Sequence, residues 1–264
     1  MCGIVAYIGK QQALPLLVNG LKRVEYRGYD SAGVAVLNDS GELESLKKQG
    51  KIAVLEEALR NRAAVPGTIG IAHTRWATHG VPNDANAHPH LSCDGGVAVV
   101  HNGTIENYQE LRELARQQGH TFRSETDTEV LAHLLEGFLA QGDDLVTAVQ
   151  RMHAVVRGAY GIAVITSKEP NRLVVARHGS PLVLGLADDG YFAASDATAF
   201  REHTDKVIYL NDGEMATFDR DGYRILTLKN EEITKCVEKL EWDLAQIAKG
   251  GYEHFMLKEI TEQP

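Results

Sequence analysis

The sequence reads AYGIAVIT over residues 159–166 and RLVVAR over residues 172–177. Both runs are short and rich in β-branched residues, and the segment between them contains Pro170 and Asn171, which are typical of a turn. Each run therefore predicts a β-strand. Similar runs continue along the chain and predict further strands at residues 181–187, 191–194, 206–210, 214–218 and 223–228.

The first half of the chain combines a few strands with helices that come in blocks. Short apolar runs predict strands at residues 2–8, 33–37, 68–73 and 97–101. Apolar residues at helical spacing predict four helices, one over about 12–25 and others around 105–115, 130–138 and 145–156. Strands in runs and helices in blocks favour an α+β fold with two sheets and outer helices over a doubly wound parallel sheet.

The composition argues against a nucleic-acid-binding protein and against a membrane protein. The 264 residues include 27 Lys and Arg against 36 Asp and Glu, which gives a formal net charge of -9. An acidic balance argues against a nucleic-acid partner. No apolar run reaches the roughly 18 residues that a membrane span requires. We therefore expect a cytoplasmic protein with no membrane partner.

Cysteine usage singles out one residue. The chain has three cysteines, and an odd number suits a reducing compartment. They also lack the close pairing that is typical of a zinc site. Cys93 and Cys236 are expected to be ordinary thiols. Cys2 follows Met1, so removal of Met1 would place a thiol and a free α-amine on one residue, nucleophile and base together. Gly3 would permit close approach of a substrate. A cysteine that only packs in a terminal strand is the alternative.

Two segments could serve such a nucleophile. HNG at residues 101–103 closes a predicted strand, so the Asn102 amide and nearby N–H groups could stabilise an oxyanion, although the same three residues could form a tight turn. HTRWATHG at residues 73–80 supplies Arg75, whose planar guanidinium suits a carboxylate, and Trp76, which could cover a pocket.

A third segment, SETDTE at residues 124–129, precedes a predicted helix. Asp127 could bind an ammonium group there, while helix capping is the alternative. Thr126 and Glu129 have the spacing of a capping box.

Histidines are concentrated between residues 73 and 101, which raises the question of a metal site. The spacing matches neither a His-Glu-x-x-His motif nor a Cys/His finger. We expect no metal, and histidines that order loops through hydrogen bonds. These are His73, His79, His88, His90 and His101.

These motifs occur in the same order as in a known protein family. They include CGIV at 2–5, YRGYDSAG at 26–33, NAHPH at 86–90 and the three segments described above. Together they resemble the glutaminase domains of class II glutamine amidotransferases, and in particular those of glucosamine-6-phosphate synthases. The resemblance covers almost the whole chain and extends through RGAYG, GSPL and ASD to MLKEI and EQP at residues 256–264.

The resemblance implies a four-layer α/β/β/α sandwich of the N-terminal-nucleophile hydrolase type. It implies a glutaminase domain over residues 1–240 and a linker over 241–264 toward a sugar-isomerase domain that this chain lacks. No cofactor is implied. A full-length enzyme of this family is expected to be a homodimer.

The resemblance also implies roles for the site residues. Cys2 attacks the side-chain amide of L-glutamine, and its α-amine moves the protons through a water. Asn102 and the Gly103 N–H stabilise the oxyanion, while Gly3 and Arg27 support the nucleophile. Arg75 binds the α-carboxylate of glutamine, and Asp127 binds its α-amino group. Trp76, Thr78 and His79 belong to a loop that closes over the substrate.

The implied reaction is hydrolysis of glutamine to glutamate and ammonia through a γ-glutamyl thioester. In the full enzyme the ammonia would convert fructose 6-phosphate into glucosamine 6-phosphate. Two alternatives stay open at this point. One is another class II amidotransferase, which makes phosphoribosylamine or asparagine, and the other is a non-catalytic amino-acid-binding module in which Met1 is retained.

Overall fold

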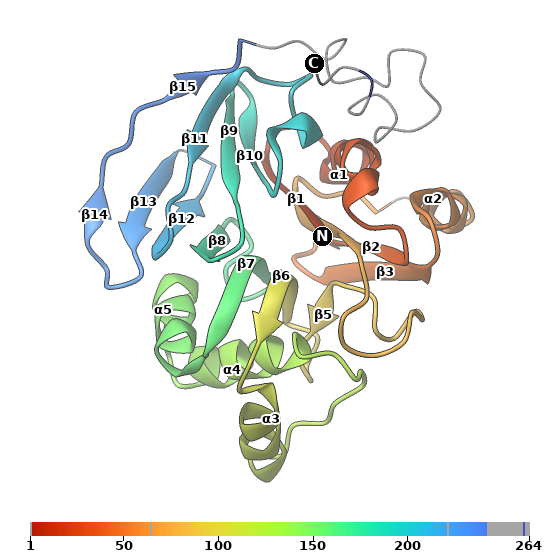
Figure 1. Cartoon of the computed structure of the whole chain (residues 1–264), viewed down its shortest axis with the longest axis vertical. Coiled ribbons are helices and arrows are strands. Elements are labelled where there is room, and N and C mark those ends of the chain that lie inside the picture. Colours follow the sequence, from red (N-terminus) through yellow and green to blue (C-terminus); the bar gives the residue numbers. More distant parts are fainter. Residues whose placement is uncertain (1, 64, 221, 242–260, 262–264) are drawn as a thin grey trace.

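Two antiparallel β-sheets stacked on each other form the centre of the molecule (Figure 1). A computed structural model describes residues 2–63, 65–220, 222–241 and 261. The first sheet has the strand order β15-β11-β9-β10-β1-β4-β2-β3. Its strands are β1 (Gly3–Gly9), β2 (Ser31–Leu37), β3 (Leu43–Gln49), β4 (Ile69–Arg75), β9 (Val183–Ala187), β10 (Gly190–Ala194), β11 (Lys206–Tyr209) and β15 (Glu238–Lys239).

The second sheet has the order β14-β13-β12-β8-β7-β6-β5. Its strands are β5 (His90–Leu91), β6 (Val97–Ile105), β7 (Gly158–Thr166), β8 (Leu173–His178), β12 (Glu214–Phe218), β13 (Tyr223–Thr227) and β14 (Glu232–Ile233). The pairings between these strands are antiparallel, both for strands that follow one another, such as β6 and β7, and for strands far apart in the chain, such as β1 and β10.

Helices cover the outer face of each sheet (Figure 1). The helices α1 (Ala13–Arg23) and α2 (Ile52–Arg60) pack on the first sheet, and α4 (Glu129–Ala140) and α5 (Leu145–Val155) on the second. Helix α3 (Tyr108–Gln117) lies next to α4, and two short 3₁₀-helices are η1 (Glu25–Arg27) and η2 (Ala197–Ala199). None of the described helices is long and apolar enough to cross a membrane.

Three apolar cores hold these layers together, and β1 contributes to two of them. Val5 and Tyr7 pack toward α1, whereas Ile4, Ala6 and Ile8 pack between the sheets. This alternation is the period of two that a strand imposes on its side chains. Because β1 is buried on both faces, it lies in the middle of the α/β/β/α sandwich, and the predicted fold class is confirmed.

The structure corrects several local predictions. The helix expected around 105–115 begins only at Tyr108, because residues 97–105 continue as β6. The capping box expected from Thr126 does not form: α4 begins at Glu129, and Thr128 occupies the cap position without a capping bond from its side chain, which contacts His101 Nδ1 at 2.8 Å. The linker predicted for residues 241–264 falls outside the described residues, except for Glu241 and Thr261.

Candidate active site

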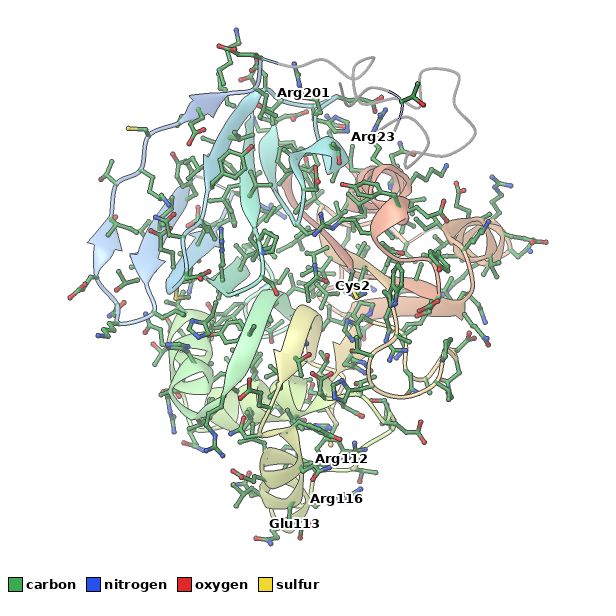
Figure 2. All side chains as sticks on the ribbon, in the orientation of Figure 1. Cys2, Arg23, Arg112, Glu113, Arg116 and Arg201 are labelled. Carbon is green, nitrogen blue, oxygen red and sulfur yellow. The ribbon has the colours of Figure 1, made fainter. Side chains whose placement is uncertain are left out.

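Cys2 directly precedes the central strand β1, near the middle of the molecule in Figure 2. Its Sγ accepts a hydrogen bond from the Trp76 N–H at 3.2 Å and lies 3.5 Å from the Trp76 carbonyl oxygen. Burial raises the pKa of the Cys2 thiol, and the Trp76 N–H and the Arg75 guanidinium only partly offset this. The thiol is therefore protonated at neutral pH and needs a base before it can react as a thiolate.

Two side chains hold the Cys2 main chain in place. The Cys2 carbonyl oxygen accepts hydrogen bonds from Arg27 Nε at 3.1 Å and from Asn102 Nδ2 at 3.0 Å. Arg27 lies in η1, and its guanidinium is also 3.6 Å from the Asp196 carboxylate. An amide nitrogen has two protons, so Asn102 keeps one free to donate beside Cys2.

His73 fixes the orientation of the Asn102 amide. His73 Nε2 lies 3.0 Å from Asn102 Oδ1, and the bond connects β4 in one sheet to β6 in the other. Burial lowers the pKa of His73 to about 3, so its ring is neutral at pH 7. With the ring nitrogen donating to Oδ1, the NH₂ group of Asn102 faces Cys2. The sequence predicted loop-ordering histidines, whereas His73 lies in a strand and positions a site residue.

Gly103 gives β6 an unusual backbone beside Asn102. Its φ is +134°, and a Cβ there would lie 2.0 Å from the Ala159 carbonyl oxygen. Only glycine fits this position. The alternative of a tight turn at residues 101–103 is wrong, because these residues belong to a strand that pairs with β7 along its length.

Arg75 ends β4 and is 4% exposed. Its Nη2 donates to the carbonyl oxygens of His79 and of Gly80, the latter at 3.1 Å. Its Nη1 is buried and has no hydrogen-bond partner among the described residues. Burial lowers the pKa of Arg75, although a guanidinium stays charged at any physiological pH. A charged, buried and unsatisfied donor of this kind favours an anionic group beside it.

The backbone of β6 fixes the position of the Asp127 carboxylate. Its Oδ2 accepts a hydrogen bond from the Ile105 N–H at 2.8 Å, so its side chain braces β6 and does not cap α4. Its Oδ1 lies 3.9 Å from His79 Nδ1. One carboxylate oxygen is therefore positioned by the fold, and the other is turned toward the loop at 76–80.

The loop at 76–80 is only partly packed. The Trp76 side chain is 47% exposed and its ring lies 5.5 Å from that of Tyr29. The Ala77 N–H donates to Asp30 Oδ2 at 2.6 Å, and Thr78 Oγ1 lies 3.3 Å from His79 Nδ1.

Two cavities meet at Cys2 and share Trp76, Thr78 and Gly103 in their walls. The smaller, of ≈ 20 Å³, reaches the Arg75 and Asp127 side. The larger, of ≈ 350 Å³, extends past Arg27 and Asn102 toward Ser180 and Pro181. The structure thus brings nearly all the predicted site residues around one thiol.

Gly3 differs from its sequence-based interpretation. A Cβ at Gly3 would lie 2.7 Å from Val24 Cγ2 and 2.9 Å from Thr74 Cγ2. The glycine is therefore needed for close packing of β1 against its neighbours. Sequence reasoning also missed Ser195, whose Oγ accepts a hydrogen bond from the Ile4 N–H at 3.0 Å and so fixes the start of β1.

A four-layer sandwich whose central strand follows a partly buried cysteine, with an amide donor beside that residue, defines the N-terminal-nucleophile class of amidotransferases. The family described as "Glutamine amidotransferase domain" matches residues 60–253, and this chain belongs to it. Curated relatives from Chlorobaculum tepidum and Bacteroides thetaiotaomicron are 54% and 52% identical over 100% of this chain. Both are named glutamine–fructose-6-phosphate aminotransferase (isomerizing), and the chain spans 43% of the length of each.

Solved structures agree on the fold. The glutamine phosphoribosylpyrophosphate amidotransferase of B. subtilis is 29% identical and superposes with a TM-score of 0.72, over 86% of this chain and 49% of that one. An allosteric regulatory enzyme of purine biosynthesis is 28% identical, with a TM-score of 0.74 over the same shares. Both comparisons confirm the predicted sandwich.

Proposed function

We propose that this chain hydrolyses L-glutamine to L-glutamate and ammonia, with Cys2 as the nucleophile once Met1 has been removed. The observation that carries the proposal is the grouping at Cys2: a thiol beside the Asn102 amide, and the buried Arg75 Nη1 across a small cavity from Asp127. Membership of the glutamine amidotransferase domain family supports the choice of substrate.

The proposed reaction runs through a thioester. The α-amine of Cys2 accepts the thiol proton through a water, and Sγ attacks the side-chain amide carbon of glutamine. The free Nδ2–H of Asn102 and the Gly103 N–H stabilise the oxyanion. The C–N bond then breaks as the protonated amine returns its proton to the leaving nitrogen, which releases ammonia. Water hydrolyses the γ-glutamyl thioester, and glutamate and the free thiol result.

An amino acid is selected over a plain amide by two fixed charges. Arg75 would bind the α-carboxylate through Nη1, which lacks a partner among the described residues. Asp127 would bind the α-ammonium group through Oδ1, because Oδ2 is occupied by the Ile105 N–H. A cation and an anion at a set separation match a zwitterion and reject a ligand that lacks one of its charges.

Glutamine needs more room than the smaller cavity offers. A volume of ≈ 20 Å³ holds about one water molecule. The loop at 76–80 therefore has to move outward for glutamine to enter and return to enclose it. Gly80, with φ of +76°, and the half-exposed Trp76 suit this movement.

The larger cavity suggests where the ammonia goes. It leads from Cys2 past Asn102 to Ser180 and Pro181. The relatives are more than twice as long as this chain. We propose that residues 1–240 form the glutaminase domain and 241–264 a linker to a sugar-isomerase part. In a cytoplasmic homodimer that part would use ammonia to convert fructose 6-phosphate into glucosamine 6-phosphate.

Other members of the class are the alternative. The phosphoribosylpyrophosphate amidotransferase is only 29% identical to this chain, whereas the aminosugar enzyme of Chlorobaculum tepidum is 54% identical. The higher identity favours the aminosugar reaction. A non-catalytic binding module would retain Met1, which an intact-mass measurement detects.

The test is an assay of glutamate and ammonia released by the purified chain after intact mass has shown the loss of Met1. We expect equal amounts of both products, and no glucosamine 6-phosphate when fructose 6-phosphate is added. A processed chain that releases no glutamate would overturn the proposal. Sugar amination by this chain alone would overturn the assignment of that step to a second part.

The Asp127→Asn variant should lose discrimination for the α-amino group. Losing the carboxylate leaves the substrate ammonium unpaired in a desolvated site, at a cost of roughly 2–5 kcal/mol. The side-chain amide can still accept from the Ile105 N–H, so the fold is preserved. We expect kcat/KM for glutamine to fall by about 30-fold or more.

The control is glutaramate, the glutamine analogue that lacks the α-amino group. Asp127→Asn should change its kcat/KM little, so the preference for glutamine over glutaramate should largely disappear. An equal loss for both substrates would show that Asp127 acts only by bracing β6.

A further inference from the structure

Four potential metal ligands converge away from Cys2, on the side of the second sheet that α4 covers. Cys93 lies in the turn between β5 and β6, His120 follows α3, and His133 and Glu136 are one helical turn apart on α4. None of them lines either cavity at Cys2. In Figure 1, α4 runs beneath β5 and β6, and the chain returns to it from the end of α3.

The ligand atoms are close enough to share one ion. Cys93 Sγ lies 3.6 Å from the Nδ1 atoms of both His120 and His133. Glu136 Oε2 lies 3.0 Å from His120 Nδ1 and 3.5 Å from His133 Nδ1. One ligand atom from each of the four residues lies within 4.8 Å of all the others.

These separations match a tetrahedral zinc site. A zinc ion with sulfur at about 2.3 Å and nitrogen or oxygen at about 2.0–2.1 Å holds sulfur and nitrogen about 3.6 Å apart, and nitrogen and oxygen about 3.3 Å apart. The observed sulfur–nitrogen distances of 3.6 Å equal the first value, and the nitrogen–oxygen distances of 3.0 and 3.5 Å lie on either side of the second. One thiolate, two imidazoles and one carboxylate also form a donor set that suits zinc better than magnesium or calcium.

A second layer of contacts orients the ligands, as metal sites require. The Thr121 N–H donates to Cys93 Sγ at 3.3 Å, and the Cys93 and Asp94 N–H groups donate to the Glu136 carboxylate at 3.1 and 2.9 Å.

The far nitrogen of His133 also faces a carboxylate. His133 is buried, and its Nε2, on the side away from the cluster, lies 3.7 Å from Glu129 Oε1. The Phe122 ring packs edge-on against His133, with centroids 4.6 Å apart, and shields it from one side. The Nδ1 atom of His133 is therefore directed at the cluster by its surroundings.

We propose that Cys93, His120, His133 and Glu136 bind one Zn²⁺ ion in a closed, structural site. The ion joins the β5–β6 turn and the segment after α3 to α4. That segment leads into residues 124–128, which include Asp127, so zinc would steady one wall of the candidate active site from outside it. Binding releases the thiol proton of Cys93, because the ligand is the thiolate. The side chains of His120 and Glu136 are 14% and 13% exposed, which leaves the ion a path from solvent.

The proposal departs from the expectations drawn from sequence, which were an ordinary thiol at Cys93 and no metal. Those expectations rested on the spacing of the histidines between 73 and 101, none of which this cluster uses, and on the absence of closely paired cysteines, whereas the cluster uses Cys93 alone. The only local signal was the i, i+3 spacing of His133 and Glu136 on one helix face, which is common without a metal.

The test measures zinc binding by the full chain. After stripping with a chelator and titration with Zn²⁺, we expect one tightly held zinc per chain by elemental analysis. Zinc should raise Tm by about 5 °C or more. Cobalt(II) in place of zinc should show the intense visible bands of tetrahedral coordination and a sulfur-to-metal charge-transfer band.

Cys93→Ser should weaken zinc binding by at least about 100-fold and abolish both the charge-transfer band and the Tm shift. Cys236→Ser, at an exposed cysteine outside the cluster, is the matched control and should bind zinc as the wild type does. His120→Gln provides a second ligand variant if Cys93→Ser folds poorly. The proposal would be overturned if the wild-type protein bound no stoichiometric zinc, or if the Cys93 and Cys236 variants had equal affinity for zinc. Either result would show that the four residues only form a hydrogen-bond network. These readouts need no glutaminase turnover, so they are independent of the proposed reaction.

Discussion

Glutamate release should be lost in Cys2→Ala and also in a chain that carries one extra residue ahead of an intact Cys2. Among the described residues, both hydrogen-bond contacts of Cys2 Sγ are to the Trp76 backbone, so no side chain is in place as its base. Burial raises the pKa of the thiol and makes a base necessary. The α-amine, with a pKa of about 7.7–8.0, can fill that role only while it is free. We expect a loss of at least about 10⁴-fold for Cys2→Ala and about 10²–10⁴-fold for the extended chain.

The decisive measurement uses an extension that a protease can remove. Turnover should be low before cleavage and return to the wild-type level after it, in the same sample. Cys236→Ser should remain fully active and controls for general thiol chemistry. Full activity of the uncleaved chain would show that the α-amine of Cys2 is not the base.

The second large effect is a loss of stability in acid, and it arises from three closely spaced, buried histidine rings. The ring of His88 lies 4.2 Å from that of His73 and 4.8 Å from that of His90, and all three residues are at most 5% exposed. Burial lowers the pKa of each, to about 3 for His73 and well below the usual value for the other two. The pKa of the neighbouring His101 is lowered as well, again chiefly by burial.

A histidine whose pKa is lower in the folded protein binds its proton only after unfolding. The contribution of the neutral ring to the free energy of unfolding is therefore complete above the pKa of about 6.5 that the residue has in the unfolded chain. This contribution is lost as the pH falls below that value. Below that pH, each such histidine lowers the free energy of unfolding by about 1.4 kcal/mol for every unit by which the pH falls. His73, His88 and His90 together therefore lower it by about 4 kcal/mol per unit. From pH 6.5 to pH 5 this loss amounts to about 6 kcal/mol, which is comparable with the roughly 5–15 kcal/mol that stabilises a domain, so we expect the free energy of unfolding to fall sharply by pH 5.

Urea unfolding at pH 7.5, 6.5, 6.0 and 5.5 measures the slope of the free energy of unfolding against pH. The buried carboxylate of Glu129 does not obscure this dependence, because its loss comes at lower pH: although burial opposes it, the nearby His133 ring and hydrogen bonds from Ser124 and the Arg123 N–H lower the pKa of Glu129 to about 2. His90→Gln removes one of the titrating rings and should reduce the slope by about a quarter to a third, depending on the share of His101. A free energy of unfolding that stays flat from pH 6.5 to 5.5 would show that the rings are protonated in the folded state.

The fold could be predicted from sequence where elements are buried, and was missed where they are not. Strand β1 is buried along nearly its whole length and was found as predicted. Strand β3 and helix α2 were missed because they lie at the edge of the molecule: β3 has no fully buried residue, and α2 buries only Ile52 and Leu55. Strand β3 therefore carries little hydrophobic pattern, whereas α2 is as amphipathic as α1 but has only 9 residues.

Candidate site residues could be selected by motif, but their connections could not. The His73–Asn102 bond crosses between sheets, and its existence depends on the registers of β4 and β6. The proposed zinc ligands likewise come from segments that meet only in the folded chain. Such contacts are set by tertiary packing, which local spacing does not encode.

The central position of β1 has a consequence for how the protein is made. Its two neighbours are β4 and β10, and β10 ends roughly 185 residues after β1 does. At about 5–20 residues per second, the ribosome needs roughly 10–40 s to supply that last partner. During this time the first strand is unenclosed on at least one side, so Cys2 stays accessible until the sheet closes. The same delay exposes an apolar strand edge, which makes nascent or truncated chains prone to aggregate.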